Sequence, residues 1–215
     1  MDVREFLAQV RRELEPVNQY IINHPIIRDA EVGTLSISAI KAFVINQWYI
    51  VNSDARSIAM AMARTKAMDE LILMRTFLDG DYNALMELTK LMRELNIEAI
   101  DPLSMNVIPE AVSYTHYLSW LAINTEPGEF AFALVINLPV WGAMVSKIDE
   151  TLKAKYGIKN TGFFELFSGH YNELEEEALP VVERYMGDGS RMRNIAVTIQ
   201  NYERSFWDAI HRVST

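Results

Sequence analysis

The longest apolar run in the chain reads FAFALVINLPVWGAMV and covers residues 130–145. Asn137 and Pro139 interrupt the run, which is shorter than the roughly 20 apolar residues that a membrane span needs. Its helical spacing continues further along the chain and predicts a helix over residues 129–156, bent near Pro139 and ended by Gly157. Because this helix is apolar but unsuited to a bilayer, we expect it to be buried inside a bundle of other helices.

The rest of the chain shows the same periodicity, since apolar residues recur three and four positions apart nearly everywhere. Glycine and proline are sparse, 9 and 7 of 215 residues, so turns are few and the elements are long. Asp79-Gly80-Asp81 reads as one of these turns. We therefore expect an all-α fold in one domain, residues 1–215, with seven to eight helices. Besides 129–156, the expected helices lie around residues 6–14, 36–65, 68–78, 83–95, 110–124, 161–185 and 190–213.

The charge and the cysteine content exclude several classes of function. The formal net charge is −9 and the sequence shows no basic stripe, which argues against nucleic acid and anionic membranes as partners. The chain contains no cysteine, so it has neither a disulfide nor a thiol nucleophile. Its first residues, MDVREFLAQVRREL, carry charges every few positions, unlike a secretory signal. We expect a cytoplasmic protein.

The last expected helix carries a carboxylate, Glu203, within its apolar face. Four apolar residues lie three, four or seven positions from Glu203 and share one helical face with it. An ionised carboxylate buried on that face is costly unless it is paired or takes up a proton. Such groups concentrate at functional sites, although a structural pair with a core Arg or Tyr explains the pattern equally well. The four residues are Ile199, Phe206, Trp207 and Ile210.

The long helix expected over residues 36–65 has a polar line inside its apolar pattern. Gln47 and Asp54 are seven positions apart and share a face, while Tyr49 lies on a neighbouring one. Arg56 is close enough along the helix to neutralise Asp54. These side chains predict a polar pocket in the bundle, and helix–helix hydrogen bonding without a ligand is the alternative.

A metal site would require His170 together with Glu173 and Glu177, at i+3 and i+7. Dinuclear iron bundles use Glu-x-x-His pairs from two helices, and the sequence contains no such pair. Gly-rich phosphate-binding loops are absent from the sequence as well. We therefore expect neither a bound metal nor a cofactor.

Several segments resemble TenA/thiaminase II proteins, and they occur in that family's order over nearly the whole chain. The opening segments are shared with relatives such as pyrroloquinoline-quinone synthase, while the closing segment is the more specific one. The segments are HPII at 24–27 with GTL at 33–35, FVINQWY at 43–49, the tyrosine-bearing helix at 114–121, NLPVW at 137–141 and YERSFWD at 202–208.

This resemblance implies a haem-oxygenase-like helical bundle with a central pocket, assembled as a homodimer or homotetramer. It also implies hydrolysis of aminopyrimidines, either cleavage of thiamine or deamination of a thiamine breakdown product. The family's closing glutamate, a proton donor or acceptor, falls on Glu203, and its pocket tyrosines fall on Tyr114 and near Tyr49. The side chains expected to line the pocket around the catalytic Glu203 are Gln47, Tyr49, Asp54, Tyr114, Val140, Trp141, His170, Tyr202, Phe206 and Trp207.

The chain departs from the family pattern at two functional positions. The family's nucleophilic cysteine falls on Val140 or on Pro139, depending on which neighbour is aligned, so no sulfur is present. The family's pyrimidine-binding aspartate falls on Gln47, which donates and accepts hydrogen bonds but cannot form a charge-assisted one as an acceptor. A hydrolase without the cysteine would need a general-base route with water.

Our leading hypothesis is a protein that binds or hydrolyses a small aminopyrimidine, with Glu203 as general acid/base hydrogen-bonded to Tyr114. A metal-dependent or cofactor-independent oxidase of the quinone-synthase type is the first alternative. Those oxidases carry a histidine–aspartate–histidine trio, which here reads His170, Leu174 and Glu177. A non-catalytic binding protein for a small heteroaromatic molecule is the second alternative.

Overall fold

The computed structural model describes residues 2–215, and helices form nearly all of this part of the chain. It contains ten α-helices, one short 3₁₀ turn and, over the described residues, no β-strand. The expected all-α fold is therefore confirmed. The helices are α1 (Val3–Glu13), α2 (Glu15–Ile22), α3 (Pro25–Glu31), α4 (Ile37–Met62), α5 (Met68–Glu94), α6 (Ser113–Asn124), α7 (Pro127–Tyr156), α8 (Gly162–Phe167), α9 (Asn172–Tyr185) and α10 (Ser190–Arg212), with the 3₁₀ turn η1 at Pro102–Ser104.

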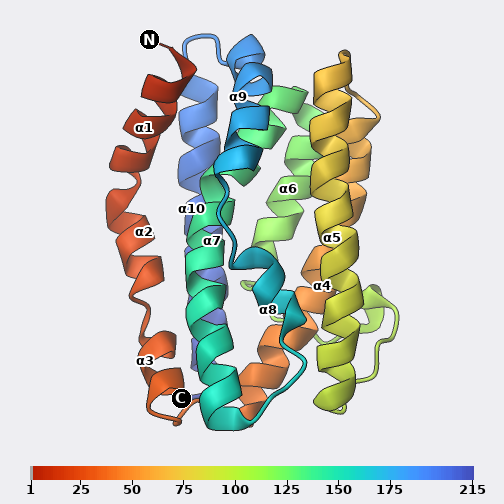
Figure 1. The fold of residues 1–215 in the computed structure, drawn as a ribbon, viewed down its shortest axis with the longest axis vertical. Coiled ribbons are helices and arrows are strands. Elements are labelled where there is room, and N and C mark those ends of the chain that lie inside the picture. The colour runs from red at the N-terminus through yellow and green to blue at the C-terminus, as the bar shows by residue number, and fades with distance from the viewer. Residues whose placement is uncertain (1) are drawn as a thin grey trace.

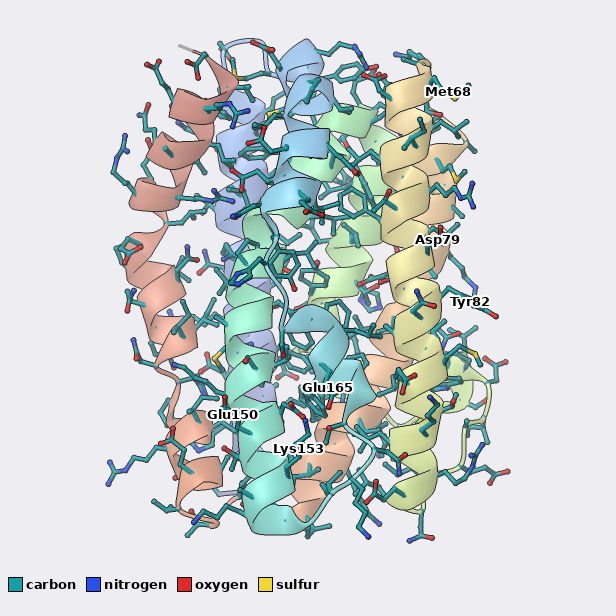
Figure 2. The ribbon with its side chains drawn as sticks, in the orientation of Figure 1. Met68, Asp79, Tyr82, Glu150, Lys153 and Glu165 are labelled. Atoms are coloured by element: carbon teal, nitrogen blue, oxygen red, sulfur yellow. The ribbon has the colours of Figure 1, made fainter. Side chains whose placement is uncertain are left out.

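The long helices run along the longest axis of the molecule (Figure 1). In this view α1, α2 and α3 follow one another along one side, α5 stands on the other, and α8 and α9 lie in front between α7 and α5. Helix α7 is the centre of the packing, because it contacts α2 to α6 as well as α8 to α10. An ion pair between Lys153 and Glu165, 2.7 Å from Nζ to Oε1, links α7 to α8 (Figure 2).

Helix α7 carries the apolar run at residues 130–145 and is buried as expected. By length and composition it is the one helix of the described chain that could cross a membrane, but 72% of its most apolar window is buried inside the bundle. Burial of this kind is that of a core helix in a soluble protein. The lipid-like composition of α7 is thus explained by its protein neighbours.

Local chemistry sets both ends of α7. Pro127 occupies the first turn, where a missing N–H costs nothing, and the Glu129 carboxylate accepts a hydrogen bond from the Glu126 N–H at 3.0 Å. Gly157 ends the helix in the left-handed conformation at φ +66°. Pro139 lies inside α7 without ending it.

The turn expected at Asp79-Gly80-Asp81 is wrong, because these residues lie in the middle of the continuous helix α5. Buried apolar residues keep the same helical face on either side of them, including Phe77 before and Ala84 after. A single glycine inside a helix costs only about 1 kcal/mol relative to alanine, so the packed stripe outweighs the turn-like composition. One long helix therefore replaces two short ones.

Two other regions hold more helices than expected, which raises the count to ten rather than seven or eight. The N-terminal region forms α1, α2 and α3, and α3 begins at Pro25 because the His24 Nδ1 accepts a hydrogen bond from the Ile26 N–H at 3.2 Å. The segment 161–185 forms α8 and α9, separated by residues 168–171.

Candidate functional site

A cavity of about 190 Å³ lies inside the bundle, between helices α4 to α10. Apolar and aromatic side chains form most of its wall, and three carboxylates face it. Over the described residues, no Lys, Arg or His lines it. The structure thus brings together six of the side chains that the sequence predicted around a pocket. They are Gln47, Asp54, Tyr114, Trp141, Glu203 and Phe206.

The cavity opens between α5 and α8. Thr76, Gly80 and Leu166 line it and are also exposed to solvent, so they form its mouth. A Cβ atom at Gly80 would meet nothing within 4 Å. The glycine therefore leaves this entrance unobstructed.

Next to the mouth, the wall formed by Phe167 and Tyr171 packs closely against α7 at Gly142. A Cβ atom there would lie 2.5 Å from the Phe167 carbonyl oxygen and 2.8 Å from the Tyr171 hydroxyl. The Tyr171 hydroxyl itself donates to the Phe167 carbonyl oxygen at 2.6 Å. This contact fixes the connection between α8 and α9, from which Phe167 and Tyr171 line the cavity.

Glu203, on α10, is the most completely partnered carboxylate of the cavity, and its burial is confirmed at 4% exposure. Its Oε1 accepts a hydrogen bond from the Trp207 Nε1 at 2.7 Å, and its Oε2 accepts one from the Asn137 Nδ2 at 3.3 Å. Burial raises the pKa of Glu203 to about 7, against the lowering effect of these two donors. We call Glu203, Trp207 and Asn137 the glutamate site.

A chain of buried amides supports the glutamate site from behind. The Asn137 Nδ2 also donates to the Gln200 Oε1 at 3.0 Å, and the Gln200 Nε2 donates to the Asn18 Oδ1 at 2.6 Å. All three amides are buried. Because each group satisfies its neighbour, the orientation of Asn137 toward Glu203 is fixed by residues that do not line the cavity.

Asp54 on α4 and Asp81 on α5 form a second acidic region, which we call the acid pair. The Asp54 Oδ1 accepts a hydrogen bond from the Thr115 hydroxyl, whereas the Asp81 Oδ2 is buried without a hydrogen-bond partner in residues 2–215. Burial raises the pKa of both carboxyls, and the charge of Asp54 raises that of Asp81 further. Two such groups cannot both ionise without a compensating charge.

Two further polar side chains face the cavity without a hydrogen bond to any described residue. Gln47 is 4% exposed and Tyr114 is 9% exposed. Burial and the charges of Asp54, Glu203 and Asp81 raise the pKa of Tyr114 well above its usual range. The hydrogen bond that we expected between Tyr114 and Glu203 is not formed, and the carboxylate oxygens accept from Trp207 and Asn137 instead. The tyrosine is left as a free donor.

Tyr49 does not line the cavity. It lies two positions from Gln47, which places it about 200° around the helix at 100° per residue. Its hydroxyl instead lies 3.0 Å from the His116 Nε2. On α6, His116 likewise lies two positions from Tyr114. The same helical geometry therefore sends Gln47 and Tyr114 inward and this second pair outward.

Four other predicted lining residues lie elsewhere. Val140 is buried beside the cavity but off its face of α7, and Trp207 lies behind Glu203 as its hydrogen-bond donor. Tyr202 packs on Tyr117, with ring centroids 5.6 Å apart. His170 is exposed and lines a surface groove. At the break between α8 and α9 the next residue, Tyr171, lines the cavity instead.

Among the polar cavity residues that were not predicted from the sequence are Asp81, Asn137 and Tyr171. Asp81 lies four positions from Phe77 and thus on its face, a signal hidden by reading Asp-Gly-Asp as a turn. Asn137 interrupts the apolar run and could have been recognised as a polar group on a buried helix. Nothing in the sequence separates Tyr171 from its neighbour.

Within residues 2–215 there is no cluster of three or more His, Asp or Glu side chains arranged to hold a metal ion. His170 in particular does not meet the cavity carboxylates, since it lines the separate surface groove. The expected absence of a metal stays a prediction. The acidic groups of the cavity are available to organic ligands.

Solved structures share this fold closely. A TenA homologue from Pyrococcus furiosus superposes with a TM-score of 0.77 at 20% identity, covering 95% of this chain and 99% of its own. A candidate TenA-like thiaminase from Sulfolobus solfataricus P2 gives 0.69 at 15% identity, covering 95% and 96%. A domain with a heme oxygenase-like fold from Shewanella denitrificans gives 0.75 at 12% identity, covering 99% and 92%. These similarities confirm the haem-oxygenase-like fold.

A search of curated proteins gave no match. The sequence does match the TENA/THI-4/PQQC family over residues 11–212. This span includes all the helices that line the cavity and leaves out only the two ends of the chain. The chain therefore belongs to the TENA/THI-4/PQQC family.

Proposed function

We propose that the protein binds a small aminopyrimidine related to thiamine salvage and hydrolyses a carbon–nitrogen bond of it, with Glu203 as general acid/base. The observation that carries this proposal is the glutamate site: a carboxyl buried in a cavity wall, held by two donors, with its pKa raised to about 7. A group with a pKa near neutrality takes and returns protons most effectively at physiological pH. Family membership and the similarity to a candidate TenA-like thiaminase support the choice of substrate class.

The size and lining of the cavity support a single flat ring as ligand. A dry protein cavity of about 150 Å³ accommodates benzene, and this cavity measures about 190 Å³. Trp141 and Phe206 pack edge to face at 5.8 Å and provide aromatic surface for the ring. Gln47 and Tyr114, both without protein partners over the described residues, supply donors and an acceptor for ring nitrogens and an exocyclic amine.

Because the chain has no thiol nucleophile, the proposed reaction uses water as the nucleophile and Glu203 first as a base and then as an acid. The ionised carboxylate removes a proton from a water molecule as the water oxygen attacks the carbon that bears the amine. The carboxylic acid so formed returns the proton to the departing nitrogen. An amine and water are thereby converted to an alcohol and ammonia, and Glu203 ends in its starting state. Trp207 and Asn137 hold the carboxylate in one orientation throughout.

The missing cysteine should make the protein a poor thiaminase. Displacing the thiazolium of thiamine calls for a strong nucleophile, which Val140 and Pro139 do not provide. A general base contributes about 10²–10⁴-fold, enough for an activated aminopyrimidine but not for this cleavage. We also infer a cytoplasmic homodimer or homotetramer, in keeping with the family resemblance and the burial of α7.

The test is to assay thiamine and a series of aminopyrimidines with the wild-type protein, Glu203→Gln and Gln47→Asp. We expect turnover of an aminopyrimidine, slow or no cleavage of thiamine, and a loss of about 10²–10⁴-fold in Glu203→Gln with substrate binding retained. Gln47→Asp should tighten binding of a pyrimidinium cation about fivefold, since a charge-assisted hydrogen bond is worth roughly 1 kcal/mol more than a neutral one.

Three outcomes would redirect the proposal. Robust thiamine cleavage that survives Glu203→Gln would show that the mechanism is wrong. Binding of a heteroaromatic with no turnover of any substrate would favour a binding protein. Oxygen-dependent turnover together with stoichiometric iron or manganese in the purified protein would favour an oxidase.

A further inference from the structure

The proposed hydrolysis uses the glutamate site and leaves the acid pair without a role. Asp54 and Asp81 come from different helices, α4 and α5, and both line the cavity. The buried Asp81 Oδ2 lacks a hydrogen-bond partner over the described residues. An unpaired buried carboxylate oxygen destabilises a fold, so its presence in a cavity calls for a group that the protein chain does not supply.

No basic side chain of the described chain compensates the acid pair. The cavity is lined by three acidic residues and by no Lys, Arg or His of residues 2–215. Arg56, which the sequence analysis considered as a partner of Asp54, is exposed, and its guanidinium donates to the Asn52 carbonyl oxygen at 2.5 Å. The charge missing from the cavity is therefore positive.

A second observation marks this part of the cavity as a ligand site. The Tyr114 side chain is 9% exposed, lines the cavity and has no hydrogen-bond partner among residues 2–215. The charges of Asp54, Glu203 and Asp81, in this order after burial, raise the pKa of this tyrosine, so it lies within reach of the acid pair as well as of Glu203. Tyr114 is thus a largely buried side chain whose unpaired hydroxyl is open to the cavity, an arrangement that a bound polar group would complete.

We propose that Asp54 and Asp81 bind a basic nitrogen of the ligand, as a protonated amine or an amidine, with Tyr114 as an additional hydrogen-bond partner. Two carboxyls from facing helices match the paired N–H donors of an amidine or the several donors of an ammonium group. The cation supplies the positive charge that lets both carboxyls ionise. This inference deepens the proposed function, because it assigns the substrate a basic group distinct from the bond on which Glu203 acts.

The test compares cationic probes with neutral molecules of the same shape. Benzamidine is paired with benzamide, and benzylamine with benzyl alcohol, and their affinities are measured by calorimetry on the wild-type protein, Asp81→Asn and Asp54→Asn/Asp81→Asn. The matched control is Asp79→Asn, which removes the same charge two positions away on α5. The Asp79 side chain is 63% exposed and comes from the middle of α5 (Figure 2).

We expect each cation to bind the wild-type protein about tenfold or more tightly than its neutral counterpart, as charge-assisted hydrogen bonds predict. The preference should fall in Asp81→Asn and disappear in the double variant, while benzyl alcohol binding shows that the cavity is intact. Asp79→Asn should keep the full preference. Equal wild-type affinities, no binding of either cation, or a preference that survives the double variant would overturn the inference.

The probes separate this inference from the proposed function because they report binding and not hydrolysis. Cation preference without turnover of any aminopyrimidine would reject the hydrolase and leave the acid pair as a cation site. Turnover that depends on Glu203, in a protein without cation preference, would support the hydrolase and reject the cation site.

Discussion

Two regions of the same cavity differ in how many protein hydrogen-bond donors their carboxylates have. At the glutamate site, both oxygens of Glu203 accept hydrogen bonds from protein groups, and buried amides as far as Asn18 fix one of the donors. At the acid pair, Asp54 has one donor, Thr115, and an oxygen of Asp81 has none in the described chain. Burial raises the pKa in both regions, so the pKa alone does not distinguish them.

The difference teaches which carboxylate is built for which task. A group that must transfer a proton in one direction benefits from being held in place before the substrate arrives. A group that binds a cation is completed by the ligand, and its partner is missing while the site is empty. We therefore read full satisfaction at Glu203 as positioning for chemistry and incomplete satisfaction at Asp81 as readiness for a ligand.

Closing the mouth should remove both functions together and have the largest effect. Gly80→Leu places a side chain in the open space at the entrance, where it would obstruct the path of a ligand, and affinity should fall by about 100-fold, or about 3 kcal/mol. We expect this loss for cationic and neutral ligands alike, measured by calorimetry. Gly80→Ala is the control, and it should keep binding while stabilising α5 by about 1 kcal/mol. Loss for only one ligand class would mean that the two regions have separate entrances.

Removing a donor from Glu203 should affect the glutamate site alone. Trp207→Phe deletes the 2.7 Å hydrogen bond that lowers the pKa of Glu203, so that pKa should rise further. Since the ionised form then appears only at higher pH, the acidic limb of the pH–rate profile should move to higher pH. Turnover at neutral pH should fall about tenfold. Benzamidine affinity should be unchanged, and a parallel loss of it would show that the two regions are coupled.

Neutralising Asp81 should stabilise the unliganded protein. The pKa of Asp81 is raised in the folded state, so between the unfolded and folded pKa values the folded protein binds more protons. Wild-type stability therefore falls as pH rises from about 4 through this window. Asp81→Asn lacks this loss and should be more stable by about 1–2 kcal/mol at pH 8 but not at pH 4, in urea unfolding. Asp79→Asn should show no such pH-dependent gain.

A substitution at Tyr49 should have the smallest effect, and it tests whether this side chain lies outside the cavity. Its hydroxyl contacts His116 and not the cavity, so Tyr49→Phe should leave ligand affinity and turnover within about twofold of wild type. Tyr114→Phe is the informative partner, because it removes a hydroxyl of similar chemistry that does line the cavity. A large effect of Tyr49→Phe would mean that Tyr49 lines the ligand pocket, as the sequence predicted.

Much of this architecture follows from periodicity in the sequence. The central position of α7 and the burial of Glu203 were predictable, because each depends on spacing along one helix. Asp81 was not, since Asp-Gly-Asp favours a turn locally and only the packing of α5 against its neighbours keeps the helix intact. Of the two partners of Glu203, Trp207 shares its helical face, whereas Asn137 comes from another helix and nothing local indicates its approach.

The close approach at Gly142 leaves the mouth between α5 and α8 as the route by which a ligand enters and leaves. Phe167 and Tyr171 occupy the space where a Cβ would lie, so a larger residue at position 142 would force the connection between α8 and α9 away from α7. The mouth is already open at Gly80, so exchange needs no separation of whole helices, a motion of microseconds to milliseconds. It depends instead on the faster flips of exposed side chains such as Leu166, and a small molecule held by modest contacts should exchange rapidly.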